Sequence, residues 1–362
     1  LRRQRQMCIR DSGWLSTGPK TITFERLLAK YTGAKYAIAV NSCTAALHLS
    51  LIALGIGKED EVITTPFTFT ATGNVIVHTG ARPVFVDIER ETYNVDPEKI
   101  EGAITSKTKA IIPVHYAGHP CNMREIIRFA QKQDLHIIED AAHAIGSEYE
   151  GKRIGTLGDT TCFSFYATKN ITTGEGGAIT TDNEKIAKKV EILRLHGMSR
   201  DAWRRYSSTG SWYYEVEDCG WKYNMDEIQA AIGIHQLEKL DKFIEIRREY
   251  AAIYGEELEN IKGIIVPNER PNVRHSYHIY PILLTESNRD RFIEKMQNKG
   301  VTCSVHFIPL HLHPFYRDRF GLKKAMFPNA EWVYEREVSL PLYPRMTEKE
   351  IWYVISCVKS II

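Results

Sequence analysis

A lysine and an aspartate that follow predicted strands are the best candidates for chemistry in this sequence. Lys169 comes shortly after the predicted strand 161–165, and Asp140 directly follows the predicted strand 135–139. A lysine held out of water has a lowered pKa and can attack a carbonyl group as a neutral amine. A carboxylate at a strand end could pair with a protonated pyridine nitrogen and keep a ring cationic. Taken alone, Lys169 could be a surface lysine, and Asp140 could bind a metal, cap a helix or act as a general acid.

Donor groups suited to phosphate follow two predicted strands. After the strand 36–40 a small polar turn runs into a helix, whose N-terminal N–H groups and positive dipole end favour an anion. The donors of this turn are Ser42, Cys43 and Thr44. Helix capping alone would also explain these residue types. Ser164, on the strand before Lys169, could reach the same phosphate.

An aromatic residue and a glycine-rich turn complete the set. Phe69 follows the predicted strand 61–64 and could stack on a flat heterocycle, although an ordinary core phenylalanine is the simpler interpretation. The turn 173–177 contains three glycines, which let the backbone pass close to a ligand. Together these residues offer phosphate donors, a partner for a ring nitrogen, a stacking group and an amine, in one order on one predicted sheet.

The elements that position these residues alternate between short β-rich runs and helical patterns. The expected strands are 36–40, 61–64, 83–86, 109–114, 135–139, 161–165 and 177–181. The expected helices between them are 44–54, 70–78 and 123–133. This alternation predicts an α/β fold with a mostly parallel sheet covered on both faces. Ligands of such sheets bind beyond the carboxyl ends of the strands. The last two strands are expected to pair across the glycine-rich turn.

The C-terminal third is expected to form a smaller α+β domain, because 362 residues exceed one ordinary core. An apolar stripe over 225–258 predicts a long helix that links the two parts. Beyond it we expect strands at 277–284 and 302–305 and helices at 289–299 and 347–359. We place a large domain at 12–240 and a small domain at 241–362. Residues 1–11 stay unassigned, because they do not join smoothly to the pattern that follows. They are basic but lack the apolar segment of a secretory signal.

Composition excludes several classes of protein. The chain is 43% hydrophobic and 25% charged with a net charge of +2, and its basic residues are scattered. We therefore expect neither nucleic acid nor a membrane as a partner. No apolar run approaches the roughly 20 residues of a membrane span. The seven cysteines are odd in number and never spaced C-x-x-C, which argues against disulfides or structural zinc and favours the cytoplasm.

Several further motifs accompany the candidate residues. They are Ser12-Gly-Trp-Leu-Ser-Thr-Gly-Pro19, Asn41-Ser-Cys-Thr-Ala-Ala-Leu47, Pro83-Val-Phe-Val-Asp87, Thr92-Tyr-Asn-Val-Asp96, Ile138-Glu-Asp-Ala-Ala-His143, Phe163-Ser-Phe-Tyr-Ala-Thr-Lys169, Gly174-Glu-Gly-Gly177, Leu195-His-Gly197, Gly220-Trp-Lys-Tyr-Asn-Met225 and Val305-His-Phe-Ile-Pro-Leu-His311. In this order, from Ser12 nearly to the C-terminus, the sequence resembles the DegT/StrS-type nucleotide-sugar aminotransferases. The resemblance implies a fold-type-I enzyme that uses pyridoxal phosphate and works as a homodimer.

The resemblance also implies roles for single residues. Lys169 matches the lysine that holds the cofactor as a Schiff base, and Asp140 matches the partner of the pyridine nitrogen. His143 stands near the ring hydroxyl, and Phe69 matches the aromatic residue that stacks on the ring. The residues that match the phosphate cradle are Cys43, Thr44 and Ser164.

Three more matches concern the partner subunit and the substrate. Asn224 matches an asparagine that reaches the phosphate of the neighbouring subunit's cofactor, so the two active sites would be shared. His306 and His311 are expected on the substrate side. Their spacing with His313 fits no zinc pattern, and we expect no metal.

The expected reaction moves an amino group from glutamate to a nucleotide-linked 4-keto sugar for surface polysaccharide or lipid A-type amino sugars. The segments 212–216 and 220–224 resemble the 4-aminotransferases that act on UDP sugars. A dehydrating branch of the family carries histidine in place of Lys169, so transamination is favoured. The alternatives are 3-amino transfer, transfer to a cyclitol ketone, and a regulator that keeps the fold without catalysis. A nicotinamide dehydrogenase is disfavoured because no G-x-G-x-x-G follows the first strand.

Overall fold

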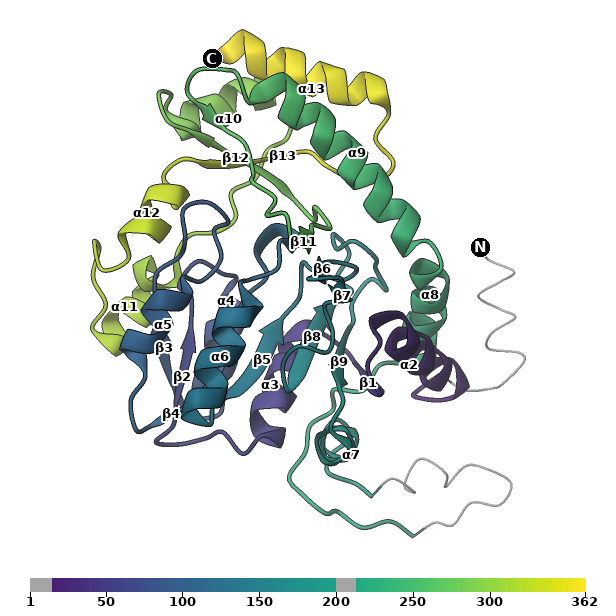
Figure 1. The fold of residues 1–362 in the computed structure, drawn as a ribbon. Coiled ribbons are helices and arrows are strands. Elements are labelled where there is room, and N and C mark those ends of the chain that lie inside the picture. Colours follow the sequence, from purple (N-terminus) through teal and green to yellow (C-terminus); the bar gives the residue numbers. More distant parts are fainter. Residues whose placement is uncertain (1–14, 200–212) are drawn as a thin grey trace.

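The computed structural model describes residues 15–199 and 213–362. The expected tail 1–11, the first residues of the Ser12 motif and Trp212 lie outside these ranges. The large sheet has the strand order β1-β9-β8-β5-β4-β2-β3 (Figure 1). Its strands are β1 (Tyr36–Val40), β2 (Glu61–Thr64), β3 (Arg82–Phe85), β4 (Thr108–Ile112), β5 (His136–Asp140), β8 (Thr160–Ser164) and β9 (Gly177–Thr181). β9 runs antiparallel to β1 and β8, while the other neighbours pair in parallel. The expected α/β fold and the expected pairing of the last two strands are confirmed.

Both faces of this sheet are covered by helices. The helices of this part are α2 (Pro19–Thr32), α3 (Cys43–Ala53), α4 (Thr70–His78), α5 (Pro97–Ala103), α6 (Met123–Gln133), α7 (Glu184–Leu193) and α8 (Glu227–Leu237). Because successive strand side chains point to opposite faces, Ile137 packs with α2, α6 and α8, while Ile138 packs with α3, α4 and α7. The continuous apolar strands seen in the sequence follow from this burial on both faces.

One edge of the sheet collects the ends of three strands. β1 and β8 both pair antiparallel with β9, so they point the same way, and β5 is parallel to β8. Val40 and Ser164, the last residues of β1 and β8, both lie opposite Gly177, the first residue of β9. The residues that follow β1, β5 and β8 therefore meet at this edge.

A second, three-stranded antiparallel sheet lies above the first part in Figure 1. Its strands are β10 (Ile264–Ile265), β12 (Tyr280–Leu284) and β13 (Glu337–Leu340), and its helices are α9 (Leu240–Leu258), α10 (Arg289–Asn298) and α13 (Glu348–Ile361). These elements share a core of their own. A third small sheet joins β6 (Glu148–Tyr149), β7 (Lys152–Arg153) and β11 (Val273–Arg274).

The chain between β12 and β13 returns to the large sheet. α11 (Pro314–Phe320) and α12 (Pro328–Tyr334) lie beside β3 at the left of Figure 1, where Tyr316 and Phe327 pack on Phe85. The Asp87 carboxylate accepts hydrogen bonds from the backbone N–H groups of Asn329 and Ala330 in the first turn of α12. The division at residues 240 and 241 stays a prediction, and this contact joins the two expected domains.

Two expected elements differ from the structure. The long helix 225–258 is two helices, α8 and α9, because α8 packs along α2 whereas α9 leads away to the small sheet (Figure 1). The strand 302–305 reduces to a single bridge between Ser304 and Ser339. None of the helices in the described ranges has an apolar stretch that could traverse a bilayer.

Candidate active site

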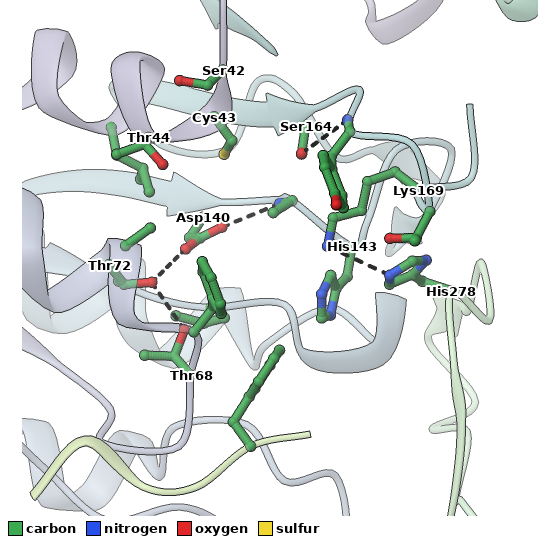
Figure 2. A pocket seen from close by; sticks show the side chains of 18 of the residues that line it. Ser42, Cys43, Thr44, Thr68, Thr72, Asp140, His143, Ser164, Lys169 and His278 are labelled. Atoms are coloured by element: carbon green, nitrogen blue, oxygen red, sulfur yellow. Dashed lines mark hydrogen bonds between the residues drawn. The ribbon is translucent and has the colours of Figure 1, made fainter. Parts of the chain in front are cut away.

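A cavity of about 370 Å³ lies at the edge where β1, β5 and β8 end. Nine sequence-predicted residues line it: Ser42, Cys43, Thr44, Phe69, Asp140, His143, Ser164, Lys169 and His306. Figure 2 shows Asp140 and Thr72 on one side of this space and Lys169 and His278 on the other. The parallel strands therefore bring together residues that lie far apart in the sequence.

Asp140, the last residue of β5, is a buried carboxylate held by two donors. Thr72 Oγ1 donates to its Oδ2 at 2.7 Å, and the Ala142 backbone N–H donates to its Oδ1 at 3.2 Å. Thr68 Oγ1 lies 2.9 Å from Thr72 Oγ1 and extends this network (Figure 2). Burial raises the pKa of Asp140, while the donor Thr72 opposes that rise. Asp140 is thus positioned to pair with a cationic ring nitrogen.

Lys169 lies in the turn after β8 with its amine in the cavity. Burial lowers the pKa of Lys169 to about 8. Its Nζ is 3.5 Å from Nε2 of His278 (Figure 2), and Nδ1 of that ring lies 3.2 Å from Oδ1 of Asn170. Since an amide oxygen only accepts, Nδ1 of His278 carries the proton and Nε2 is left to accept from Lys169. This arrangement holds a weakly basic amine in a fixed place.

His143 packs beside His278, with ring centroids 4.4 Å apart. The Ala117 backbone N–H donates to Nδ1 of His143 at 3.3 Å, so the neutral ring carries its proton on Nε2. Burial, reinforced by Lys169, lowers the pKa of His143 well below its usual range. His143 is therefore a neutral hydrogen-bond donor in the cavity wall at neutral pH.

The start of α3 and the start of β9 approach each other closely at the opposite end of the cavity. Ser42 Oγ accepts from the Ala45 backbone N–H at 3.1 Å, so Ser42 caps α3, as the simpler interpretation expected. A Cβ on Gly177 would lie 2.4 Å from the backbone carbon of Ser42 and 2.5 Å from the backbone nitrogen of Cys43. A Cβ on Gly176 would lie 2.2 Å from Oγ1 of Thr173. Glycine at these two positions therefore lets the start of β9 lie directly against the N-terminus of α3 and against Thr173.

Phe69 differs from the ordinary core residue that was the simpler interpretation. Its side chain lines the cavity and is 60% exposed, whereas Phe67 is fully buried. Its ring centroid is 6.0 Å from that of Phe307, which lines the same cavity from the C-terminal part of the chain. Two aromatic rings are thus available to a flat ligand.

Two predicted residues do not line the cavity of this chain. Asn224 is half-buried beside the end of β1, and its Nδ2 donates to Thr17 Oγ1 at 2.8 Å. His311 is fully buried, with Nε2 2.9 Å from Oε1 of Glu331. We correct the expectation for His311: its ring packs in the layer that holds α11 and α12 to the large sheet, away from the cavity lining.

Sequence reasoning missed several lining residues, among them Thr68, Thr72, Tyr166, Glu175, His278 and Phe307. Neither Thr72, in the first turn of α4, nor His278, just before β12, has a sequence signal of its own, because the role of each comes from a contact with a distant part of the chain.

Lys169 is the one lysine or arginine among the described residues that line the cavity. Burial lowers the pKa of all three lining histidines, His143, His278 and His306.

The residues of the cavity fit pyridoxal phosphate. Lys169 offers an amine near its neutral form, and Asp140 offers a buried carboxylate for a ring nitrogen. The N-terminus of α3 and the side chain of Ser164 offer donors for a phosphate, and the close approach of Gly177 to Ser42 and Cys43 holds that N-terminus in place. In the described ranges, no group of three or more His, Cys, Asp or Glu residues is placed to hold a metal ion.

A family profile and two related proteins match nearly the whole chain. The sequence profile of the DegT/DnrJ/EryC1/StrS aminotransferase family matches residues 2–359, including most of the segment that we left unassigned. The chain is 63% identical over 355 residues to Uncharacterized protein MJ1066 of Methanocaldococcus jannaschii, covering 97% of this chain and 92% of that protein. It is 51% identical over 357 residues to the Spore coat polysaccharide biosynthesis protein SpsC of Bacillus subtilis, covering 97% of this chain and 92% of SpsC.

Solved structures agree with the sequence relatives. The PMP-form of Spr1654 from Streptococcus pneumoniae, described as a sugar aminotransferase, is 35% identical with a TM-score of 0.92, and the match covers 97% of this chain and 94% of that chain. Its PLP-form is 34% identical with a TM-score of 0.90, covering 97% of this chain and 93% of that chain.

Proposed function

This chain belongs to the DegT/DnrJ/EryC1/StrS aminotransferase family and is a pyridoxal-phosphate-dependent sugar aminotransferase, and from this premise we propose that it transfers an amino group from glutamate to a nucleotide-linked 4-keto sugar. The observation that carries the proposal is Lys169, a buried amine that faces the same cavity as Asp140. SpsC, a relative named for spore coat polysaccharide biosynthesis, supports a product used in a surface polysaccharide.

We assign the cofactor-holding roles to the residues that line the cavity. When bound, pyridoxal phosphate supplies an aldehyde carbon that takes up the amino group and a ring that withdraws electron density from the reacting carbon. Asp140 would hold the ring nitrogen protonated, His143 would donate from Nε2 to the ring hydroxyl, and Phe69 would stack on the ring. The phosphate would be held by Ser42, Cys43, Thr44 and Ser164.

Lys169 is the residue that we assign to proton transfer. Its Nζ has a pKa of about 8, so it can accept a proton from the α-carbon of the amino donor and give one back near neutral pH. His278 Nε2 accepts from this amine and restricts its position. We place His306 on the substrate side of the cavity, where it joins the wall from the C-terminal part of the chain.

The substrate is tested by a screen of the two half-reactions. The holoenzyme is first loaded with glutamate and separated from it, and then keto sugars are offered one at a time. Only an accepted sugar restores the starting absorbance, and we expect this from UDP-linked 4-keto sugars. Lys169→Ala is the control and should abolish turnover. Restoration by 3-keto sugars or cyclitol ketones alone would contradict the proposed substrate.

We further propose that the chain works as a homodimer with shared active sites. Asn224 supports this proposal, because its half-buried amide lies beside β1 and outside the cavity of its own chain. Its hydrogen bond to Thr17 holds it in place. In a two-fold dimer, such a residue can complete the phosphate site of the second copy.

Subunit mixing tests the shared site. Lys169→Ala and Asn224→Ala should each have little activity alone. A mixed dimer of the two variants has one site with both residues intact, so random mixing should restore about a quarter of wild-type activity. Thr17→Val removes the hydrogen bond but keeps Asn224, and it controls for local disturbance. Mixtures that stay as inactive as the separate variants would exclude sharing through Asn224.

We also propose a cytoplasmic location. All six cysteines within the described residues are free thiols, which persist in a reducing compartment. Fractionation of the source cells with an antibody to this chain would test the location.

A further inference from the structure

Glu337 is a buried carboxylate that none of the cofactor-holding roles uses. It is the first residue of β13, is fully buried, and forms no ion pair with any lysine or arginine in the described ranges. Its Oε2 accepts the backbone N–H of His306 at 2.7 Å, and its Oε1 accepts the hydroxyl of Ser339 at 2.5 Å. A carboxyl group without a counter-ion in such a place is costly unless its hydrogen bonds matter.

The hydrogen bonds of Glu337 continue to the cavity. Ser339 Oγ lies 2.9 Å from Nδ1 of His306, and His306 lines the cavity that holds Lys169. A chain of three side chains therefore runs from the core of the small sheet to the site. Tyr116 donates its hydroxyl to the backbone oxygen of His306 at 2.5 Å and holds this segment from the other side.

The direction of these hydrogen bonds depends on one proton. When Glu337 is ionised it only accepts, so Ser339 donates to it, Nδ1 of His306 donates to Ser339, and Nε2 of His306 is an acceptor. When Glu337 is protonated, Oε1 can donate to Ser339, because Oε2 is already taken by the backbone N–H of His306. Ser339 then donates to Nδ1, and Nε2 carries the proton.

We propose that Glu337, Ser339 and His306 form a proton relay that takes one proton from the ammonium group of the entering amino donor and returns one to the carbonyl oxygen of the keto sugar. That oxygen leaves as water with this proton and a second one from the amino group that replaces it. Each transfer shifts one proton along three hydrogen bonds and changes no oxidation state. Glu337 and Ser339 are positioning residues, because they act only through His306. The role in catalysis rests on the proposed function, whereas the coupling of Glu337 to His306 does not.

The surroundings of Glu337 allow its carboxyl group to gain and lose a proton at a pH of about 8. Burial raises the pKa of Glu337 to about 8, while the hydrogen bonds from Ser339 and the His306 backbone, and then the charge of Arg289, oppose the rise. Burial, with a contribution from Lys169, lowers the pKa of His306 to about 4. Below a pH of about 8 the relay holds its proton on the carboxyl group and can give it up, and it takes up a proton from the form in which Glu337 is ionised. The His306 ring passes protons without staying charged. The other titratable groups that influence Glu337 or His306 are Tyr93, Tyr116, His143, His278 and Cys303.

The position of the proton on the His306 ring shows the state of the relay, and it can be measured in the protein without cofactor or substrate. We expect ¹⁵N NMR of histidine-labelled protein to show the proton of His306 on Nε2 below a pH of about 8 and on Nδ1 above it. In Glu337→Gln the amide oxygen must accept the His306 backbone N–H, so the amide nitrogen donates to Ser339. The proton should then stay on Nε2 at every pH. His306→Gln identifies the signals.

Ser339 gives a matched pair of variants for the kinetic test. Ser339→Ala breaks the relay and leaves the backbone bond to Glu337, whereas Ser339→Thr keeps the hydroxyl. We expect Ser339→Ala to slow both half-reactions by roughly tenfold to a hundredfold through kcat, with KM little changed and the rate no longer following the titration of Glu337. Ser339→Thr should retain most of the rate.

The outcomes separate this proposal from the proposed function. A His306 ring that keeps one tautomer throughout the titration of the wild-type protein overturns the relay, even if glutamate and the keto sugar react as expected. Equal half-reaction rates in Ser339→Ala and wild type also overturn it. A tautomer switch in a protein that ignores glutamate supports the coupling and counts against glutamate as the donor.

Discussion

Lys169 is the residue whose chemistry depends most directly on its surroundings. Because burial lowers its pKa to about 8, the apoprotein should take up pyridoxal phosphate with a rate that rises about tenfold per pH unit below that value and levels off above it. Stopped-flow absorbance over a pH series measures this rate. Free Nα-acetyl-lysine, with a midpoint near 10.4, is the control. A midpoint at the value of free lysine would contradict the buried amine.

Asp140 allows a second test at this scale. Asp140→Asn removes the negative charge but keeps the size, so we expect kcat to fall by about 10²–10³-fold. Thr72→Val is the matched control, because it keeps the Asp140 carboxylate and removes its 2.7 Å donor together with the hydrogen bond between Thr72 and Thr68. It should cost about tenfold or less. Single-turnover kinetics with saturating amino donor would measure both. Near-normal turnover of Asp140→Asn would remove Asp140 from the mechanism.

At the scale of elements, the start of β9 lies directly against the N-terminus of α3, where we place the phosphate of the cofactor. Gly177→Ala would place a methyl group 2.4 Å from the backbone of Ser42, so α3 must shift and its donors must leave their positions. We expect weaker binding of pyridoxal phosphate by roughly tenfold or more, since a lost hydrogen bond to a charged group costs about 1.5–3 kcal/mol. Fluorescence titration of the apoprotein would measure the affinity.

Gly102→Ala is the matched control for this element-scale prediction. Gly102 lies in α5, and a Cβ there would meet nothing within 4 Å. This substitution should leave cofactor affinity unchanged and raise the free energy of unfolding by about 0.5–1 kcal/mol, because alanine favours the helix. Equal effects of the two substitutions on affinity would contradict the role of Gly177.

The elements of the large sheet could be predicted because local pattern and burial agree there. Asp140 and Ser164 were found from sequence because Asp140 directly follows one predicted strand and Ser164 lies near the carboxyl end of another, and parallel strands share one ligand-binding edge. In the structure each is the last residue of its strand. The apolar period continues from α8 into α9, so the sequence alone suggested one helix. Their separation depends on which neighbour each one covers, and that is a property of the tertiary fold.

At the scale of the whole molecule, Arg247 of α9 connects the small sheet to the site. It is 3% exposed, and its Nη1 donates to the backbone oxygens of Tyr277, His278 and Leu342 at 3.2, 3.0 and 2.8 Å. Arg247→Met would leave these oxygens without that donor. We expect a loss of about 3 kcal/mol or more in the free energy of unfolding, together with weaker cofactor binding as His278 shifts.

Denaturant unfolding with and without pyridoxal phosphate measures both effects of Arg247→Met. Arg291→Met, on an exposed face of α10, is the control and should stay within about 0.5 kcal/mol of wild type. An Arg247→Met protein as stable as the control would refute the connection.

The site residues that could not be predicted from the sequence depend on how the whole chain folds. His278, Phe307 and Glu337 belong to the C-terminal part of the chain and reach the cavity or its relay only because the small sheet folds back over the large one. No motif spacing encodes such a contact. His311 shows the converse, since a histidine near the expected substrate side is buried against Glu331 instead.

The charge of the cavity wall has a consequence for ligands that carry phosphate. Lys169 is the one lysine or arginine among the described lining residues, and burial keeps the three lining histidines neutral. Hydroxyl and amide donors, rather than long-range attraction, would then hold a nucleotide sugar in a single chain. Added sodium chloride should weaken that binding little. A steep dependence on ionic strength would show that cations from another segment, or from a second copy, complete the site.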